Sequence, residues 1–323
     1  MVAKRISRRV ALGILGAAPI VRIVPSLAQG LVSTRPWRVA YANTTDEIPF
    51  AVAVLKGLKE AARKRPRFEM TWLDNRNDAA RAVEIARTVA SSGYDLFIEY
   101  NSQQAANRPI AGILSEEKIK ALSIQTPLPG YPIYMVDNWR SGSEGGRALV
   151  EQAMKKWPGT APVAMVIGSP ELGAIFQERA NAARKTIEEG FPGLNVVEFS
   201  SKNDAGNTRQ LVFDTLTRFP GQKIVIWVHL DSMALAVLAA ARNAKRESDV
   251  LIASTGGDAA VFPEIRKDNS ALIGTYSFFP ELWGEDILSI AEKILLNEPV
   301  PEQSRPSQAE FITRDNITQF YPQ

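Results

Sequence analysis

The sequence predicts an α/β protein with two lobes, each a parallel sheet flanked by helices. From Trp37 to Thr313, segments with strand and helix patterns alternate with little interruption. Such alternation is typical of parallel sheets covered by helices. About ten strands in roughly 295 residues suit two sheets better than one, because domains usually hold about 100–200 residues. A proline-rich break at residues 127–132 comes just before Asp137 and marks a boundary between the lobes.

The first strand, loop and helix form the unit from which the rest of the fold is predicted. Residues 37–42 alternate and are rich in β-formers, residues 43–49 carry only loop chemistry, and residues 50–62 place apolar side chains at helical spacing. In an open α/β sheet, the loop after such a strand faces the ligand crevice. Asn43, Asp46 and Phe50 are therefore expected near one wall of a site, and an ordinary surface turn is the alternative.

The later elements follow from the same patterns. Helices are indicated by apolar residues at helical spacing, by an N-cap such as Asp78 and by a stop such as Gly93. The predicted helices are residues 79–90, 104–114, 143–157, 171–189, 205–218, 231–244, 259–267 and 281–296. The predicted strands are residues 68–73, 94–100, 121–124, 131–136, 163–167, 196–200, 224–228, 250–254, 271–276 and an edge strand at 309–313. We expect the first lobe to hold residues 36–137 and about 255–280, and the second residues 138–254 and about 281–323.

The N-terminus has the pattern of an export signal peptide at residues 1–28. Basic residues are followed by an apolar run from Val10 to Val21 and by the small residues Ser26 and Ala28. The stretch Ser7–Leu12 resembles a twin-arginine signal. The apolar run is too short to span a bilayer. The mature chain is therefore expected in the periplasm, with a retained N-terminal anchor as the alternative.

Charge and cysteine content narrow the function classes further. Residues 1–28 contain five basic and no acidic side chains, so the net charge of +3 becomes about −2 once they are removed. A nucleic-acid surface would need a basic stripe, and none is evident. The chain has no cysteine, which excludes a lipid anchor on a cysteine after the signal. We expect an unanchored monomer that does not bind nucleic acid.

The residue patterns of common enzymes are mostly absent. His229 is the single histidine, and there is no nucleophile elbow and no glycine-rich phosphate loop. One histidine and no cysteine leave too few of the usual ligands for a zinc site. We expect no catalytic residue, no metal and no cofactor. A hydrolase or isomerase that uses His229 remains as the enzymatic alternative.

Polar side chains at the predicted strand ends indicate binding instead. They are amides, hydroxyls, glycines and a neutral imidazole, which orient a small polar ligand without reacting with it. These residues are Asn43, Asn101, Gln125, Asp137, Gly168, Ser169, His229, Gly256 and Gly257. Among the aromatic residues, Trp139, Phe278 and Trp283 stand at element ends and are pocket candidates, whereas Trp227 lies within a strand and is expected in the core.

Taken together, these motifs resemble the type I periplasmic sugar-binding proteins. These are the ribose- and galactose-type receptors of ABC importers, related to the effector domains of Lac-repressor-family regulators. The matching stretches are residues 43–50, Asn77-Asp78, residues 91–95, Asp137-Asn138 with Gly145-Gly146, Glu178-Arg179 and residues 229–235. The resemblance implies two Rossmann-like lobes of the periplasmic binding protein-like I type, three crossovers between them, and closure over a ligand in the cleft.

This chain departs from the family pattern at several expected ligand contacts. Gln125-Thr126 stands where the family has an Asp-Arg pair, and Leu230 stands where it has an Asn. Gly256 stands in place of an Asp, and Phe278 in place of a Gln. Arg179, in contrast, matches a ligand contact of the family. Such polar groups make a site selective for a hydroxylated ligand. The pocket is therefore expected to be less polar than a ribose site.

We expect a periplasmic substrate-binding protein that delivers a small sugar-like or polyol-like solute to an ABC permease. The alternatives are a ligand-presenting receptor for a membrane sensor kinase or chemoreceptor, and a binder of a less polar non-sugar solute. The candidate ligand-binding residues are Asn43, Asp46, Phe50, Asn101, Gln125, Asp137, Trp139, Arg179, His229, Asp231, Gly256 and Phe278.

Overall fold

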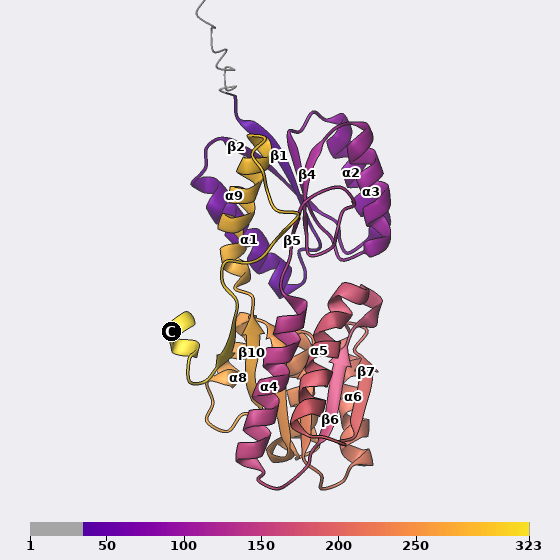
Figure 1. Ribbon diagram of the computed structural model, residues 1–323, viewed down its shortest axis with the longest axis vertical. Coiled ribbons are helices and arrows are strands. Elements are labelled where there is room, and N and C mark those ends of the chain that lie inside the picture. The colour runs from indigo at the N-terminus through magenta and orange to yellow at the C-terminus, as the bar shows by residue number, and fades with distance from the viewer. Residues whose placement is uncertain (1–34, 323) are drawn as a thin grey trace, which may run out of the picture. The chain divides into compact units, whose positions relative to one another are not determined.

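The computed structural model describes residues 35–322, so the predicted signal peptide lies outside the described part of the chain. Pro36–Gln323 forms one compact unit that contains two six-stranded sheets, each covered by helices on both faces (Figure 1). The predicted fold class is confirmed. Along residues 35–322, no helix combines the length and the apolar character that a membrane crossing requires.

The first lobe contains a sheet in the order β11-β5-β4-β3-β1-β2, with all neighbouring strands parallel. Its strands are β1 (Trp37–Asn43), β2 (Phe68–Asp74), β3 (Leu96–Tyr100), β4 (Lys120–Ile124), β5 (Ile133–Tyr134) and β11 (Gln303–Ser304). One face is covered by α1 (Pro49–Arg63) and α9 (Trp283–Leu295), and the other by α2 (Ala79–Ser91) and α3 (Gln104–Glu116).

The second lobe repeats this plan with the order β12-β10-β9-β8-β6-β7, in which only the edge strand β12 is antiparallel among the described strands. Its strands are β6 (Val163–Gly168), β7 (Val196–Ser200), β8 (Ile224–Val228), β9 (Val250–Gly256), β10 (Leu272–Ser277) and β12 (Glu310–Thr313). One face is covered by α4 (Asn138–Lys156) and α5 (Ala174–Gly190), and the other by α6 (Ala205–Arg218), α7 (Asp231–Asn243), α8 (Phe262–Ile265) and α10 (Ile317–Phe320).

The chain passes between the two sheets between β5 and α4, between β10 and α9, and between β11 and β12. The strand order contradicts the predicted allocation of two segments. β10 belongs to the second sheet, whereas α9 packs on the first, where Ile287 and Leu288 share a core with Val54 and Leu58. The strand–helix alternation is the same on both sides of this crossing, so the pattern could not show which sheet each element joins.

Aspartate caps fix the start of one helix in the first lobe and two in the second. Each carboxylate accepts a hydrogen bond from a backbone N–H of the first turn, which satisfies a donor that the helix leaves free. The pairs are Asp78 with Arg81 N at 2.7 Å, Asp137 with Arg140 N at 2.9 Å, and Asp204 with Asn207 N at 2.5 Å. The predicted helix start after Asp78 is confirmed.

The central strands are buried on both faces, as expected for parallel sheets. Every residue of β8 is buried, including Trp227, which confirms its predicted place in the core. The indole lies against Gly145 of α4, where an added Cβ would approach its nitrogen to 2.8 Å. Small residues on α4 thus let this helix lie close to the sheet.

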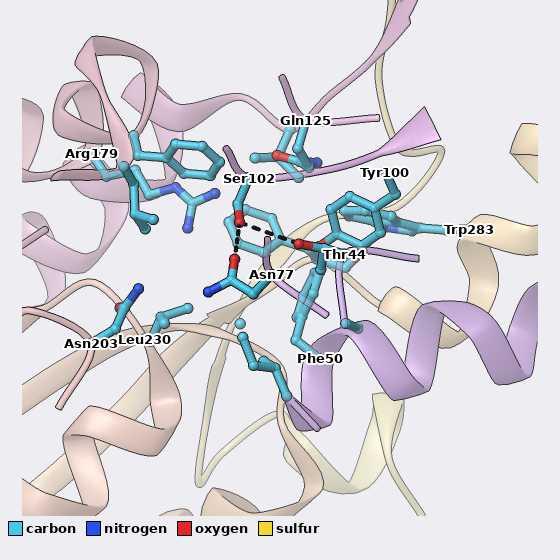
Figure 2. Close-up of a pocket in the computed structure, with 17 residues that line it drawn as sticks. Thr44, Phe50, Asn77, Tyr100, Ser102, Gln125, Arg179, Asn203, Leu230 and Trp283 are labelled. Carbon is cyan, nitrogen blue, oxygen red and sulfur yellow. Dashed lines mark hydrogen bonds between the residues drawn. The ribbon is translucent and has the colours of Figure 1, made fainter. Parts of the chain in front are cut away.

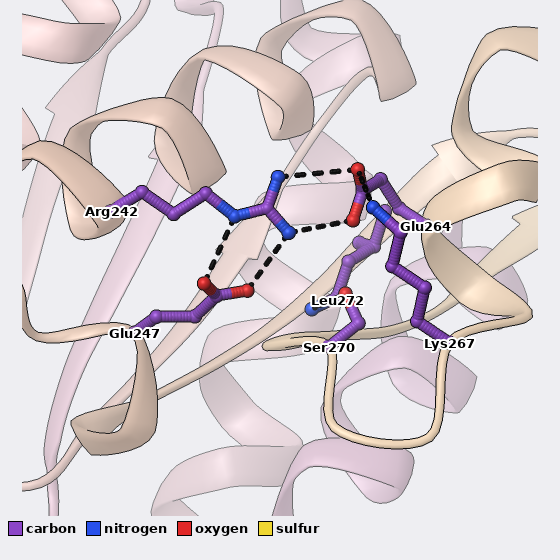
Figure 3. Close-up of polar contacts among 6 residues, drawn as sticks. All are labelled: Arg242, Glu247, Glu264, Lys267, Ser270 and Leu272. Carbon is purple, nitrogen blue, oxygen red and sulfur yellow. Dashed lines mark hydrogen bonds and ion pairs between the residues drawn. The ribbon is translucent and has the colours of Figure 1, made fainter.

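A group of ion pairs holds the C-terminal end of α7 (Figure 3). Arg242 donates from Nε to Glu247 at 2.9 Å and from Nη2 to Glu264 at 2.7 Å, and Lys267 also pairs with Glu264 at 2.7 Å. Hydrogen bonds from Arg242 hold the pKa of the Glu264 carboxyl at about 2. A helix that follows a parallel strand ends at the opposite edge of the sheet from the strand's carboxyl end, so this group stabilises the edge remote from the site described below.

Candidate functional site

A pocket of about 90 Å³ lies between the two lobes, at the carboxyl ends of their strands (Figure 2). This is the position at which open α/β sheets bind ligands. The first lobe and its helices supply Thr44, Ile48, Phe50, Ala51, Asn77, Tyr100, Ser102, Gln125, Val136 and Trp283. The second lobe and the crossing after β10 supply Leu172, Phe176, Arg179, Asn203, Leu230, Gly256 and Phe278.

One wall carries a chain of three small polar side chains from the loops after β1, β2 and β3. Thr44 Oγ1 lies 3.2 Å from Ser102 Oγ, which donates to Asn77 Oδ1 at 2.8 Å, as the dashed lines in Figure 2 show. Gln103 Nε2 also donates to Asn77 Oδ1, at 3.0 Å. These mutual bonds hold the hydroxyls and the amide in place without a ligand.

A second wall is aromatic. The ring of Phe50 meets those of Trp283 and Phe278 edge-to-face, with centroids 5.2 and 6.1 Å apart. Trp283 Nε1 donates to the Phe278 carbonyl at 2.8 Å, which satisfies the buried indole. The three rings form a rigid apolar surface of the kind that packs against the non-polar face of a ligand.

Arg179 of α5 projects into the pocket from the second lobe and is only 6% exposed. Its Nε donates to Asn138 Oδ1, and its guanidinium lies 4.9 Å from the centroid of the Phe278 ring. An added Cβ on Gly142 would lie 2.0 Å from the Arg179 carbonyl, so this glycine permits the close approach of α4 and α5. Burial lowers the pKa of Arg179 to about 10, and the side chain remains charged at neutral pH.

Gln125 follows β4 and lines the same pocket. Its φ of +64° is in the left-handed region, which a non-glycine residue adopts at some cost in strain. Both atoms of its buried side-chain amide lack a hydrogen-bond partner among residues 35–322. Buried polar groups are normally paired, so this amide offers an unused donor and an unused acceptor at the pocket.

Of the twelve predicted site residues, five line the pocket: Phe50, Gln125, Arg179, Gly256 and Phe278. The amides of Asn43 and Asn101 bond to nearby side chains of the first lobe. Asn43 Nδ2 donates to Asp46 Oδ1 at 2.7 Å, and Asn101 Nδ2 donates to Asn107 Oδ1 at 2.7 Å. Asn43, Asp46 and Asn101 therefore shape the loops and do not line the cavity.

Asp137 and Trp139 are also away from the pocket lining. Asp137 caps α4 and pairs with Arg305, and Trp139 is 46% exposed on the outer side of that helix, near Lys185. Their position at the end of a predicted element was correct. The helix begins five residues earlier than predicted, so Trp139 lies in its first turn rather than in the preceding loop.

His229 and Asp231 are buried cross-links between strand ends of the second lobe. His229 Nε2 lies 2.7 Å from Ser201 Oγ. Asp231 accepts hydrogen bonds from Ser254 Oγ and Thr275 Oγ1 at 2.5 and 2.6 Å, together with two backbone N–H groups. Neither residue lines the pocket, and their hydrogen-bond partners lie within residues 35–322. Their role as ligand contacts stays a prediction.

His229 should make stability depend on pH. Burial lowers its pKa to about 3, so the folded state keeps it neutral while the unfolded state binds a proton below about pH 6.5. Stability is therefore complete above pH 6.5 and falls as the pH drops towards 3. The advantage of the wild type over His229→Gln should shrink by about 2 kcal/mol between pH 7 and pH 5. Urea unfolding of the wild type and of His229→Gln at pH 7 and pH 5 measures this change in the stability difference. The same pH dependence in both proteins would contradict the prediction.

Sequence reasoning missed the short polar lining residues Thr44, Asn77, Ser102 and Asn203. Asn77 and Asn203 occupy equivalent places in the two lobes, each directly before a capping aspartate and each with positive φ, 54° and 51°. The Asn-Asp pair that recurs in the two lobes is the sequence feature from which Asn77 and Asn203 could have been predicted. Leu172 and Phe176 were missed because apolar residues at a helix start look like ordinary core.

The pocket has the composition of a site that binds a small molecule, with aromatic side chains and a few convergent polar groups. Its titratable lining side chains are Arg179 and Tyr100, and burial raises the pKa of the Tyr100 hydroxyl far above neutrality. No group of three or more acidic or histidine side chains in the described part of the chain is arranged to hold a metal ion. Two similar lobes around such a pocket are the architecture of a bilobal solute-binding protein.

Comparison with known proteins gives the family. A family model described as "Periplasmic binding protein domain" matches residues 39–299, and the chain belongs to this family. A search of curated protein sequences finds no match.

Solved structures of the same fold cover nearly the whole chain. An ABC transporter solute-binding protein from Actinobacillus succinogenes with bound D-allose is 15% identical with a TM-score of 0.78, covering 88% of this chain and 99% of that one. A protein from Mycobacterium smegmatis with bound glycerol is 18% identical with a TM-score of 0.79, covering 89% and 98%. One from Bacillus halodurans with bound myo-inositol is 17% identical with a TM-score of 0.77, covering 90% and 98%. At these identities the likeness shows the fold.

Proposed function

We propose that this protein is a periplasmic substrate-binding protein that holds a small hydroxylated solute in the interlobe pocket and delivers it to an ABC permease. The observation that carries the proposal is a pocket lined from both lobes, with an aromatic wall and a few convergent polar groups. This is the composition of small-molecule sites. The bound allose, glycerol and myo-inositol of the similar structures support a hydroxylated solute.

Delivery requires that the ligand change the shape of the protein. Because both lobes line the pocket, a solute that contacts both favours their closure, and the closed pair of lobe surfaces is what a permease recognises. The export signal predicted at residues 1–28 supports a periplasmic location, where we propose that the protein acts as a monomer without catalysing a reaction.

Small-angle X-ray scattering tests the proposal. A thermal-shift screen of sugars, polyols and sugar acids first identifies a solute that raises the melting temperature, since a ligand of the folded state alone stabilises it. Saturation with that solute should reduce the radius of gyration. An unchanged radius at saturation would contradict delivery by closure.

Phe50→Ala should weaken binding of that solute by about 10- to 100-fold while the protein stays folded. The ring supplies apolar contact at the pocket wall, and it is only partly buried, so its loss leaves the core largely intact. Isothermal titration calorimetry measures the change. Phe213→Ala is the matched control, because Phe213 is 48% exposed on α6 and does not line the pocket. Equal affinities of the two variants would argue against this wall as a ligand contact.

A further inference from the structure

We propose that the solute is an anion, namely a small hydroxylated carboxylate of the sugar-acid type, and that Arg179 binds its carboxylate. This inference rests on the proposed function and names the chemical class of solute for the same pocket.

The first argument is the charge balance of the pocket. None of the lining residues is an aspartate or a glutamate, so Arg179 is the one ionic group in the lining at neutral pH. Among residues 35–322, no carboxylate lies within ion-pair distance of its guanidinium, and only Nε makes a hydrogen bond. Burying a charge without a partner costs free energy. A ligand carboxylate would supply the missing partner.

The second argument is the direction of the free donors. With Nε bonded to Asn138, the two terminal nitrogens of Arg179 point into the cavity, towards Asn77 and Ser102 (Figure 2). The flat faces of Phe176 and Phe278 lie 5.5 and 4.9 Å from the guanidinium carbon and leave its edge free. Paired N–H donors on one edge match the two oxygens of a carboxylate.

Two helix N-termini at the pocket favour the same sign of ligand charge. Helix α1 begins after the lining residue Ile48, and α5 carries the lining residue Phe176 in its first turn. Neither helix has a side-chain cap or an acidic residue in its first turn, whereas α2, α4 and α6 are capped by aspartate. The uncapped N–H groups add positive potential at the pocket.

The remaining polar groups account for the hydroxyls. The side-chain amide of Gln125 is buried with its oxygen and nitrogen both unpartnered, so it can accept from and donate to a hydroxyl. The cavity of about 90 Å³ favours a small solute, and hydroxy acids of three or four carbons are the smallest members of the proposed class.

Calorimetric titration with matched pairs tests the proposal. Each acid is compared with the neutral polyol of the same carbon number: D-glycerate with glycerol, D-erythronate with erythritol, and D-ribonate with ribitol. We expect the acid to bind at least about 10-fold more tightly, with the largest preference in the three- and four-carbon pairs. A polyol that binds as tightly as its acid would overturn the inference and leave the proposed function intact. If neither the acids nor any neutral solute of the thermal-shift screen binds, the inference of an anionic solute and the proposed function both fail.

Variants at the pocket separate charge recognition from general damage. Arg179→Gln should weaken binding of the preferred acid by at least about 30-fold and that of its polyol far less. Gln125→Leu is the control within the same pocket, because it removes hydrogen bonds without changing charge and should leave the acid-to-polyol ratio unchanged. Circular dichroism melting reports whether Arg179→Gln folds. If Arg179→Gln does not fold, Arg179→Lys takes its place, because lysine keeps the positive charge. Arg179→Lys should still prefer the acid to the polyol. A loss of that preference would count against the proposal.

Discussion

Gly57→Ala is expected to lower the free energy of unfolding by about 3 kcal/mol or more, and Gly112→Ala to raise it by up to about 1 kcal/mol. Both glycines lie inside helices of the first lobe. A Cβ on Gly57 of α1 would lie 2.1 Å from the Glu281 carbonyl oxygen, whereas a Cβ on Gly112 of α3 meets nothing within 4 Å. Alanine relieves the entropic disadvantage of glycine in a helix only where the space is open.

The contact at Gly57 is made by backbone on both sides. A Cβ on Gly284 of α9 would in turn lie 2.2 Å from the Gly57 carbonyl oxygen, so the two helices approach without intervening side chains. Urea unfolding of both variants measures the opposite changes. Similar stabilities of Gly57→Ala and Gly112→Ala would show that α1 and α9 can separate at little cost. Because Trp283 lies beside this contact, Gly57→Ala should also weaken solute binding.

Asp231→Ala is expected to lower the free energy of unfolding by about 3–5 kcal/mol. The buried carboxylate accepts four hydrogen bonds, from the hydroxyls of Ser254 and Thr275 and from the backbone N–H groups of Gly257 and Asp258 at 2.7 Å. Its loss leaves four donors without a partner inside the protein. Asp231→Asn keeps one acceptor oxygen and should be intermediate.

Asp204→Ala is the matched control for Asp231→Ala. Asp204 is exposed and caps α6 with one bond to a backbone N–H, so its loss should cost about 1 kcal/mol. Chemical denaturation compares the two. If Asp231→Ala were as stable as Asp204→Ala yet failed to bind solute, the sequence prediction of Asp231 as a ligand contact would be supported.

Much of the fold could be predicted because it depends on local pattern. Buried parallel strands read as continuous apolar runs, as in Ile224–Val228, and helix starts are marked by caps such as Asp78. The pairing of β10 with β9, and of α9 with α1, depends on contacts between residues far apart in the chain. Local sequence patterns do not indicate these long-range contacts. For this reason the crossing of the chain between β10 and α9 was predicted at the wrong place.

The candidate site was predicted less completely. Among the predicted residues that line the pocket, Phe50 was predicted from the loop after the first strand, and Gln125 and Phe278 from their places at element ends. Arg179 was predicted from the family resemblance. Asn43, Asn101, His229 and Asp231 are polar residues at strand ends as well, yet they bond to other protein groups. Whether a buried polar side chain serves the protein or a ligand depends on which partner lies within about 3 Å of it.

The sequence by itself determined the two-lobed α/β class, and it predicted a site at the strand ends that is less polar than a ribose site. The tertiary structure alone decided which side chains face the cavity. It showed that Arg179 is buried without a carboxylate partner and that the amide of Gln125 is unpaired. The physical reason is that charge balance and hydrogen-bond satisfaction are sums over neighbours from both lobes, and these neighbours are brought together only when the chain folds.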